Sequence, residues 1–391
     1  MNPGADVHYR EVARTLVPKI AACADQIEQD RQLPQPLVDE LVDAGLFKLL
    51  LPRWLGGAQV DPGTFVEVLE EISKVDASTA WVICQTAGCS MAAATLRRDV
   101  AEEIFGGTPH GILAWGPGLG ARAVVADGGY RVTGTFSFLS GGRHATWLGG
   151  FAPVHDAEGT PRRKPDGGPD MRWMLFPLAK TTMLDVWHVI GLRGTGSDSF
   201  SVSDVFVPEA YTVPRHEEPA PHDPSPLYCF PYVSLFAVGF AGVALGLARS
   251  SLEAFIALAK DKTPRGFKGT LRENAVIQSQ VAQAEARLAG ARLYLITSLQ
   301  EIWQAVERAR RVTIDQRVRI RLAASYAILQ AREVVNFAYH GAGSTAVFIG
   351  APFERRFRDM YAITQQMQGR DDHFESVGQY LLGLDANIAH L

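Results

Sequence analysis

The sequence predicts an α+β protein with an N-terminal α-helical domain, a middle β-barrel or sandwich domain and a C-terminal four-helix bundle. Three observations support this fold class. Apolar residues recur every three or four positions before residue 110 and after residue 229, as in amphipathic helices. Between residues 111 and 213 they fall in short runs separated by Gly and Asp turns, as in strands. A proline-rich segment separates these last two regions.

The length of the chain also favours several domains. With 391 residues it exceeds the size of one ordinary hydrophobic core. We therefore expect a helical domain over residues 1–110, a β domain over 111–213, a linker over 214–228 and the bundle over 229–391.

The N-terminal region predicts a series of helices. Pro18 should kink the first helix or begin a new one. A short helix follows Pro36 and ends at Gly45, and Asp61 can cap the helix after it. A further apolar helix runs from Trp81 to about Leu96. The apolar face of the first helix consists of Val12, Leu16, Ile20, Cys23 and Ile27.

The middle region predicts a hairpin and further strands. Val124–Val125 and Tyr130–Phe138 flank the turn Asp127-Gly128-Gly129. Because the segment 155–170 is rich in Gly, Pro and charge, we expect an exposed loop there. Other strands are expected at 147–154, 171–176 and 201–207.

The last region predicts long helices. The first of them is as apolar as a membrane-spanning helix. Cys229–Ala248 carries no charge and is long enough to cross a bilayer. Its many small residues suit close helix packing instead, so we expect a buried bundle helix and no membrane association. Further helices are expected at about 272–309, 313–337 and 353–382.

Composition excludes some classes of function. The apolar fraction is 47%, and the net charge of −4 gives no basic field for nucleic acid. The arginine-rich run 308–321 should face solvent or a partner subunit. The cysteines Cys23, Cys84, Cys89 and Cys229 form no CxxC pair, and no signal peptide precedes them, so we expect a cytoplasmic protein.

Two other kinds of site are not expected. His216 and His222 beside the linker, and the acidic cluster 371–375, lack the convergent ligands that a metal needs. No GxGxxG sequence follows a strand, so we expect no Rossmann site for NAD(P)H.

The order and spacing of several motifs carry a resemblance that spans nearly the whole chain. Together they resemble the acyl-CoA dehydrogenase fold. Trp187, Gly191–Ser197 and Ser140–Trp147 are most similar to the oxygenase components of two-component flavin monooxygenases, such as those that hydroxylate steroid-derived phenols or oxidise dibenzothiophene. The motifs are Leu33-Pro34, Ala44–Phe47, Leu51–Gly57, Asp127–Tyr130, Gly134–Gly141, Gly191–Ser197, Val205–Pro208, Arg265–Phe267, Gly341–Ser344 and Arg355–Asp359.

The resemblance implies FAD, used as FADH2, as the cofactor, with FMN as an alternative and O2 as co-substrate. It also implies a separate flavin reductase and a homodimer or homotetramer. Phe138, Leu139 and Ser140 match the strand that lies against the isoalloxazine ring. Trp115 and Gly118, with Gly116 and Gly120, match the loop on its other side.

Other matched positions hold the pyrophosphate and adenine, in this family partly from a neighbouring subunit. An arginine can pair with phosphate in bidentate fashion, and glycines let backbone donors approach it. These positions are Arg265, Phe267, Gly341, Ala342, Gly343 and Ser344.

The chain departs from its relatives at the catalytic positions. Acyl-CoA dehydrogenases use a glutamate base, and Met367 or Gln368 stands in its place here. A base elsewhere, such as Asp261, remains an alternative. The phenol hydroxylases use two histidines, which are replaced here by Gln366 and by residues in the region Cys89–Ala92. This argues against a substrate that must first lose a proton.

These matches give a set of candidate site residues. Ser140, His144 and Gln366 are the catalytic candidates, although a structural role for His144 is an equal alternative. Cys89, Trp115, Trp187 and Gln366 are expected to line the substrate pocket.

Three functions are therefore open. The first is a reduced-flavin monooxygenase acting on an apolar, electron-rich small molecule, such as an indole-like ring, a sulfide or an amine. The second is an FAD-dependent dehydrogenase with a relocated base. The third is a binding protein that has lost catalysis.

Overall fold

The computed structural model describes residues 3–106, 111–118, 120–165, 167–214 and 222–386. Its N-terminal region consists of α1 (Pro3–Asp30), α2 (Gln35–Asp43), α3 (Pro62–Ser73), α4 (Ala77–Ser90) and α5 (Arg98–Phe105).

Local chemistry explains most of these helix boundaries. Gly45, at φ 76°, follows the end of α2, and the Asp61 carboxylate accepts the backbone N–H groups of Gly63 and Thr64 at the start of α3. Pro18 differs from the expectation, because α1 runs through it without a new helix start. The apolar face of α1 packs against α3, and this contact outweighs the hydrogen bond that proline cannot donate.

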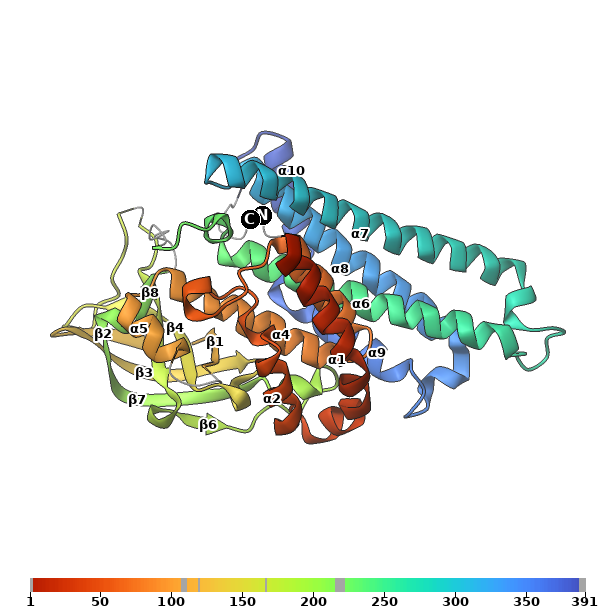
Figure 1. Cartoon of the computed structure of the whole chain (residues 1–391), viewed down its shortest axis with the longest axis horizontal. Coiled ribbons are helices and arrows are strands. Elements are labelled where there is room, and N and C mark those ends of the chain that lie inside the picture. The colour runs from red at the N-terminus through yellow and green to blue at the C-terminus, as the bar shows by residue number, and fades with distance from the viewer. Residues whose placement is uncertain (1–2, 107–110, 119, 166, 215–221, 387–391) are drawn as a thin grey trace.

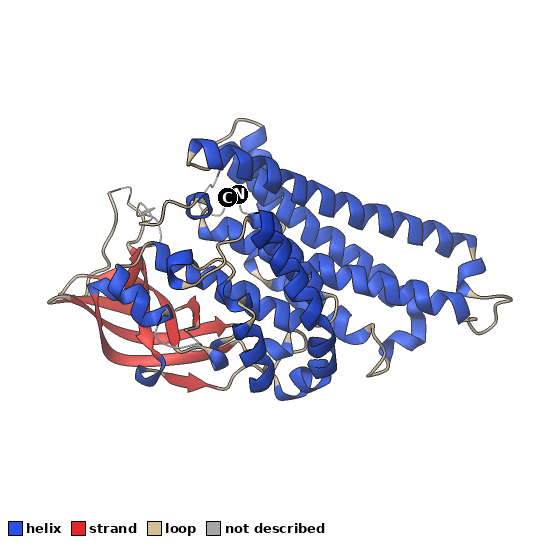
Figure 2. Ribbon diagram, viewed as in Figure 1, coloured by secondary structure: helices blue, strands red, loops and turns tan. Residues whose placement is uncertain are grey.

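The β domain contains β1 (Leu113–Pro117), β2 (Arg122–Ala126), β3 (Gly129–Leu139), β4 (Trp147–His155), β5 (Met171–Pro177), β6 (Thr182–Leu184), β7 (Asp198–Pro208) and β8 (Thr212–Pro214). The strand order is β6-β7-β3-β2-β4-β5-β8, and β1 pairs with β4 in parallel. Figure 2 shows the strands gathered at one end of the molecule, with the long helices at the other. The hairpin predicted around Asp127–Gly129 is the antiparallel pair β2–β3.

The C-terminal region contains α6 (Tyr232–Asp261), α7 (Ala275–Ala309), α8 (Ile314–Ala342), α9 (Glu354–Gln365) and α10 (Asp372–Leu381). The single helix predicted over 353–382 is wrong, because α9 ends at Gln365 and a 3-10 turn, Met367–Gly369, follows it. Gln366 has extended backbone at ψ 150°, and its side chain accepts the Gln368 N–H at 2.6 Å. This side-chain bond starts a new turn and interrupts the helix.

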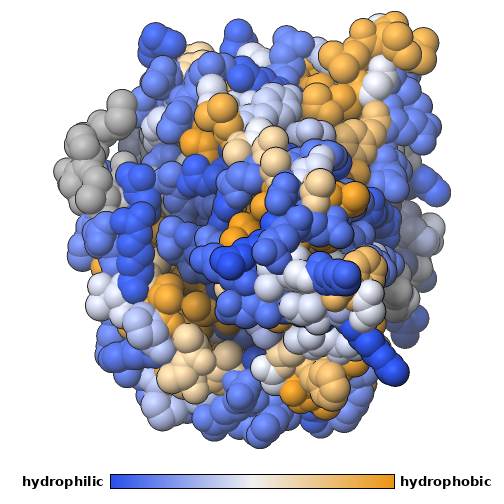
Figure 3. Space-filling view, turned by 90° about the vertical axis from the view of Figure 1, so that its right-hand side faces the viewer, coloured by the Kyte–Doolittle hydropathy of each residue, from blue (hydrophilic) through white to orange (hydrophobic). Residues whose placement is uncertain are grey.

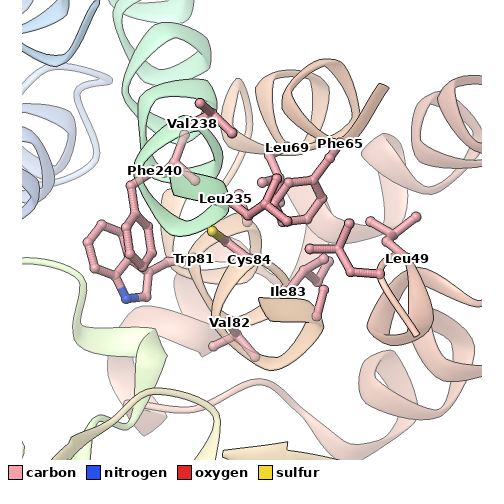
Figure 4. Close-up of a cluster of buried hydrophobic side chains, with 14 of the residues drawn as sticks. Leu49, Phe65, Leu69, Trp81, Val82, Ile83, Cys84, Leu235, Val238 and Phe240 are labelled. Carbon is pink, nitrogen blue, oxygen red and sulfur yellow. The ribbon is translucent and has the colours of Figure 1, made fainter. Parts of the chain in front are cut away.

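The apolar helix α6 is buried in the protein. Of its candidate membrane-spanning window, 83% is buried, and it contacts α3, α4 and α8. Small residues permit this packing, since a Cβ on Gly246 would lie 2.2 Å from the Glu70 carbonyl oxygen of α3. Figure 4 shows Trp81 of α4 against Phe240 of α6, whose rings stack with centroids 3.9 Å apart.

The N-terminal helices lie between the β domain and the bundle (Figure 1). The described part of the expected linker is attached to them: Gln59 donates to buried Asp223 at 2.9 Å, and the Tyr228 hydroxyl donates to the Leu50 carbonyl at 3.0 Å. His216 lies outside the described residues. The end of β3 meets α4, because Trp81 of α4 donates to Ser140, and α4 packs in turn on α6. The candidate site lies at this junction.

Candidate functional site

The end of β3 presents an aromatic ring to the surface. Phe138 has φ 63°, a conformation that L-residues rarely adopt, and the pairing of β3 with β7 shifts register between Phe136 and Leu139. This irregularity leaves the Phe138 side chain 60% exposed. The Trp187 ring meets it edge-on, with centroids 6.3 Å apart. The two rings form an apolar wall that is open on one side.

A chain of buried hydroxyl groups begins two residues after Phe138. The Ser140 side chain accepts the Trp81 indole N–H at 3.0 Å, and its Oγ lies 2.7 Å from Ser197 Oγ. Ser197 Oγ lies 2.6 Å from Thr195 Oγ1, which donates to the Leu192 carbonyl at 2.8 Å. Ser140 is 5% exposed. The catalytic candidate Ser140 is thus held from α4 on one side and from the 191–197 motif on the other.

Leu192 connects this chain to the rest of the site. Its φ is 51°, its N–H donates to Asp359 Oδ1 at 2.6 Å, and its carbonyl also accepts the Trp187 indole N–H at 3.0 Å. The glycine that precedes it allows the close contact with α9, since a Cβ on Gly191 would lie 2.2 Å from the Arg358 carbonyl oxygen. The segment Gly191–Ser197 therefore packs against α9 through its backbone.

Charged side chains hold the loop that carries Trp187. Asp198 is buried and accepts the N–H groups of Val186 and Trp187 at 3.0 Å each, while Arg143 Nε donates to it at 2.6 Å. Arg31 pairs with both oxygens of Asp185, at 2.7 and 3.0 Å. The hydrogen bond from Arg31 lowers the pKa of Asp185 to about 2. This network fixes the orientation of Trp187.

Asp359 is a buried acid beneath the site. It is 3% exposed, and burial raises its pKa to about 7, with a further increase from the neighbouring carboxylates of Asp76 and Glu28. The Leu192 N–H and the positive charge of Arg358 oppose this shift. Its protonation state is therefore sensitive to pH near neutrality.

His144 lies on the turn after Ser140 and is mostly buried. Burial lowers its pKa to about 4, and the neighbouring positive charge of Arg143 contributes in the same direction. The imidazole is therefore neutral at pH 7 and is a weak base.

Trp115 and Cys89 lie together in a separate apolar cluster. Trp115 is buried and stacks on Trp173 with centroids 4.3 Å apart, and Gln85 Nε2 approaches both the Trp115 carbonyl at 3.4 Å and Cys89 Sγ at 3.7 Å. Burial raises the pKa of the Cys89 thiol well above its usual value. The thiol is therefore protonated and packs as an apolar group.

Gly116 in β1 and Gly118 just after it allow β1 to lie against the end of β3. A Cβ on Gly116 would lie 2.0 Å from the Ser137 carbonyl oxygen, and one on Gly118 would lie 2.5 Å from the Phe136 ring. Trp115, expected in a loop, lies in β1. The segment that contains Trp115 and Gly118 is close to the end of β3, where Phe138, Leu139 and Ser140 lie.

Amides occupy the region where the resemblance places a base. Gln366 caps the turn Met367–Gly369, and buried Gln368 accepts a hydrogen bond from the buried guanidinium of Arg321. Asp261 is the last residue of α6, about 30 Å along the helix axis from Phe240. Because Phe240 stacks on Trp81, Asp261 of the same chain lies too far away to act beside Ser140.

The residues matched to pyrophosphate and adenine lie at the opposite end of the bundle (Figure 1). Arg265, Phe267, Gly343 and Ser344 are exposed there, and Lys262 Nζ donates to the Ala342 carbonyl and to Thr345 Oγ1. A cleft of about 530 Å³ opens beside Gly341, lined by Ile277, Gln280, Glu333, Asn336, Phe337 and His340. One chain therefore does not bring these residues together with Phe138.

Metal binding finds no support in the residues that the structure describes. Among them, no three His, Cys, Asp or Glu side chains are grouped so as to hold an ion. His222 is exposed.

Sequence reasoning missed several residues of the junction. The sequence places Trp81 only in an apolar helix, and it places Thr195 and Ser197 in the Gly191–Ser197 motif without indicating a role for either. The polar side chains of Thr195 and Ser197 within a glycine-rich motif were the available signal, because buried polar groups need hydrogen-bond partners. The partners themselves depend on the fold. Asp198 and Asp359 were missed for the same reason.

Two family models match the chain. One is described as the N-terminal domain of acyl-CoA dehydrogenase and matches residues 7–103, and the other as its C-terminal domain and matches residues 238–368. Among curated proteins, an indole-3-acetate monooxygenase of Pseudomonas putida is 28% identical over 360 residues, which cover 92% of this chain and 89% of that protein. The flavin-dependent monooxygenase oxygenase subunit HsaA of Mycobacterium tuberculosis is 28% identical over 356 residues, covering 89% and 88%.

Solved structures agree with these matches. The crystal structure of HsaA from M. tuberculosis has a TM-score of 0.89 at 25% identity and covers 99% of this chain and 100% of that one. XiaF from Streptomyces sp., solved with FADH2 and glycerol, has a TM-score of 0.88 at 24% identity and covers 97% and 96%. The predicted fold class is confirmed as N-terminal helices, a central β domain and a C-terminal helical domain.

Proposed function

The chain belongs to the acyl-CoA dehydrogenase family, and we propose that it inserts one oxygen atom from O2 into an apolar, electron-rich small molecule. It is an oxidoreductase, the oxygenase component of a reduced-flavin-dependent monooxygenase. One observation carries the proposal about its chemistry: the segment that holds the base in dehydrogenases presents the amides of Gln366 and Gln368. An amide cannot accept the α-proton of an acyl thioester.

The junction at β3 fits a flavin. The open wall formed by Phe138 and Trp187 offers an apolar face to a flat ring, and the Ser140 oxygen offers a hydrogen-bond acceptor at its edge. Reduced flavin, when bound, supplies the electrons that activate O2. The protein excludes water with these aromatic rings and orients the ring system through Ser140.

FAD suits the chain better than FMN as the flavin. The cleft beside Gly341 has polar walls from Gln280, Asn336 and His340 and an aromatic wall from Phe337, which suit an adenine ring. Because this cleft lies at the end of the bundle far from the β domain that carries Phe138 (Figure 1), the two sites would be joined in a homodimer or homotetramer.

The exposed apolar residues support the same assembly. Val347, Phe348 and Ile349 form an exposed loop at the end of the bundle, where Ile349 is 93% exposed. Figure 3 looks onto this end and shows apolar surface between polar patches. Val186 and Ile190, on the segment that carries Trp187, are exposed apolar side chains and give the β domain a second apolar surface. Contact between these two surfaces in neighbouring subunits would cover both.

Reduced flavin must come from a separate reductase. An oxygenase component of this kind depends on such a partner, and the sequence has no Rossmann motif for NAD(P)H. The purified protein alone should therefore not oxidise NADH at a steady rate.

The substrate should be nucleophilic without losing a proton first. His144, with a pKa of about 4, and Gln366 are both too weak to deprotonate a phenol. An indole-like ring meets this requirement, and the similarity to an indole-3-acetate monooxygenase supports it. Sulfides and amines meet it equally, so an S- or N-oxygenase is the second candidate.

Incubation under labelled oxygen tests the proposal. With reduced FAD from a reductase, we expect one labelled atom in the product of indole-3-acetate, indole or an aryl sulfide. Free phenols should react poorly, and anaerobic addition of an acyl-CoA should not bleach bound FAD. Turnover of an acyl-CoA without incorporation of label would overturn the proposal in favour of dehydrogenation.

A further inference from the structure

The order of hydrogen bonds along the hydroxyl chain follows from the number of protons available. Each hydroxyl has one proton to donate and two lone pairs to accept with. Thr195 donates its proton to the Leu192 carbonyl at 2.8 Å. Ser197 must then donate to Thr195, 2.6 Å away, and Ser140 must donate to Ser197, 2.7 Å away.

Trp81 completes the environment of Ser140. Its indole N–H is a donor only, and it donates to Ser140 Oγ at 3.0 Å. Ser140 therefore accepts one hydrogen bond and donates one. Ser140 Oγ therefore has one lone pair left to accept a hydrogen bond from a ligand, but it has no proton left to donate.

If the three hydroxyl groups donate in the opposite direction, the series contains one hydrogen bond fewer. In that order Thr195 donates to Ser197, Ser197 donates to Ser140, and the proton of Ser140 is left without a partner in the chain. The Leu192 carbonyl would lose the Thr195 hydroxyl and keep the Trp187 indole N–H at 3.0 Å and the Thr195 backbone N–H at 3.2 Å. The reverse order therefore becomes competitive only when a ligand accepts the Ser140 proton.

We propose that Ser197 and Thr195 are positioning residues that turn the proton of Ser140 away from the flavin, so that the site favours reduced over oxidised cofactor. The inference rests on the proposed function, in which the N5 edge of the flavin lies at Ser140. N5 of reduced flavin carries a hydrogen and donates, whereas N5 of oxidised flavin has a lone pair and accepts. The lone pair of Ser140 complements the first and opposes the second.

This preference suits an enzyme that takes up reduced flavin and exchanges it after each turnover. Binding of oxidised flavin requires the chain to reverse, at the loss of the Thr195–Leu192 hydrogen bond. Release of the oxidised cofactor is favoured by the same amount. The discrimination is thus set by two residues that need not touch the flavin.

Flavin affinities in both redox states test the inference. The dissociation constants of oxidised FAD and of anaerobically reduced FAD are measured for the full-length protein and for Ser197→Ala and Thr195→Val. Each variant removes a hydroxyl that keeps the Ser140 proton directed at Ser197, so Ser140 can donate that proton to N5 of the flavin. The ratio of the oxidised to the reduced constant should fall about three- to tenfold. A tenfold fall lowers the two-electron midpoint potential of bound FAD by about 30 mV.

Two controls separate this effect from a structural one. Thr195→Ser keeps the hydroxyl and should keep the wild-type ratio. Ser199→Ala removes a hydroxyl two residues after Ser197, on β7. That hydroxyl donates to Ser137 Oγ at 2.9 Å and is not part of the Ser140–Ser197–Thr195 series, so the ratio should be unchanged. A wild-type ratio in folded Ser197→Ala and Thr195→Val proteins would overturn the inference.

Ser140→Ala distinguishes this failure from failure of the proposed site. If Ser140→Ala weakens binding of reduced FAD while the ratio in the other two variants is unchanged, the flavin site stands and the role of Ser197 and Thr195 is lost. If Ser140→Ala changes neither dissociation constant, the flavin does not lie at Ser140, and both conclusions fall.

Discussion

At the scale of single residues, Leu192 determines much of the geometry of the site. Its backbone adopts φ 51°, which is unfavourable for a side chain larger than Gly by about 1–2 kcal/mol. Three contacts offset this: the N–H donates to Asp359, and the carbonyl accepts from Trp187 and Thr195. A change at Asp359 therefore reaches both the aromatic wall and the hydroxyl chain.

Asp359→Asn should change the pH dependence of stability. Because the pKa of Asp359 is raised to about 7, the unfolded chain loses this proton near pH 4 while the folded protein keeps it. Wild-type stability is therefore penalised progressively as pH rises from 4 to 7. Asn retains an acceptor for the Leu192 N–H without a charge. Between pH 5 and 8 the variant should gain about 2–3 kcal/mol relative to wild type in urea unfolding.

A comparison of variants removes the contribution of other groups. His144, whose pKa is lowered to about 4, gives an opposite trend over pH 4 to 6.5, and this trend is common to both proteins. Asp385→Asn, at an exposed position near the C-terminus, is the control and should retain the wild-type pH dependence. A constant stability difference between Asp359→Asn and wild type across this range would contradict the prediction.

At the scale of elements, α6 organises the molecule. It stacks Phe240 on Trp81, which holds Ser140, and it contacts α3 and α8 along its length. Its glycines allow this approach, because a side chain at Gly239 would collide with Cys84 and one at Gly246 with the Glu70 backbone. The composition that made α6 resemble a membrane span is the composition that close packing requires.

Substitution of two helical glycines by alanine distinguishes the effect of packing on stability from the effect of helix propensity. Gly246→Ala should destabilise the protein by about 1–3 kcal/mol, because the new Cβ would lie 2.2 Å from the Glu70 carbonyl oxygen. Gly290→Ala on α7 meets no atom within 4 Å and should stabilise it by about 0.5–1 kcal/mol. The urea midpoint of unfolding measures both effects. Equal shifts of the midpoint in the two variants would show that the close contact of Gly246 with α3 does not contribute to stability.

At the scale of the whole molecule, the candidate flavin contacts are divided between two ends of the chain. Phe138 and Ser140 lie on the β domain, and the cleft beside Gly341 lies at the far end of the bundle (Figure 1). A complete FAD site therefore requires a neighbouring subunit in the proposed arrangement. Assembly and cofactor binding should then be linked.

Negative charge introduced into the exposed loop Val347–Ile349 should weaken both subunit assembly and FAD binding. Wild-type protein should have a light-scattering mass of two or four times 42.6 kDa. Phe348→Asp combined with Ile349→Asp should shift the mass toward the monomer and weaken FAD binding, since buried charge disfavours an apolar interface. Leu382→Asp, at an exposed position on another surface, is the control. A monomeric wild type that binds FAD normally would refute the assembly.

The sequence by itself determined the order of the helical, β and bundle regions, the β2–β3 hairpin and the burial of α6. These features depend on local periodicity, turn residues and small-residue composition, which a linear pattern records. The motifs also determined the family, because their order along the chain is specific even though each alone is common.

Only the tertiary structure decided the partners within the site. Trp81 and Ser140 are 59 residues apart, and Leu192 and Asp359 are 167 apart, so no local pattern joins them. The break after α9 was also invisible, because Gln366 continues a helical pattern until its side chain caps the next turn. Hydrogen bonds between distant residues form only after packing of α4, α6 and α9 has fixed their distances, and for that reason the hydroxyl chain could not be read from the sequence.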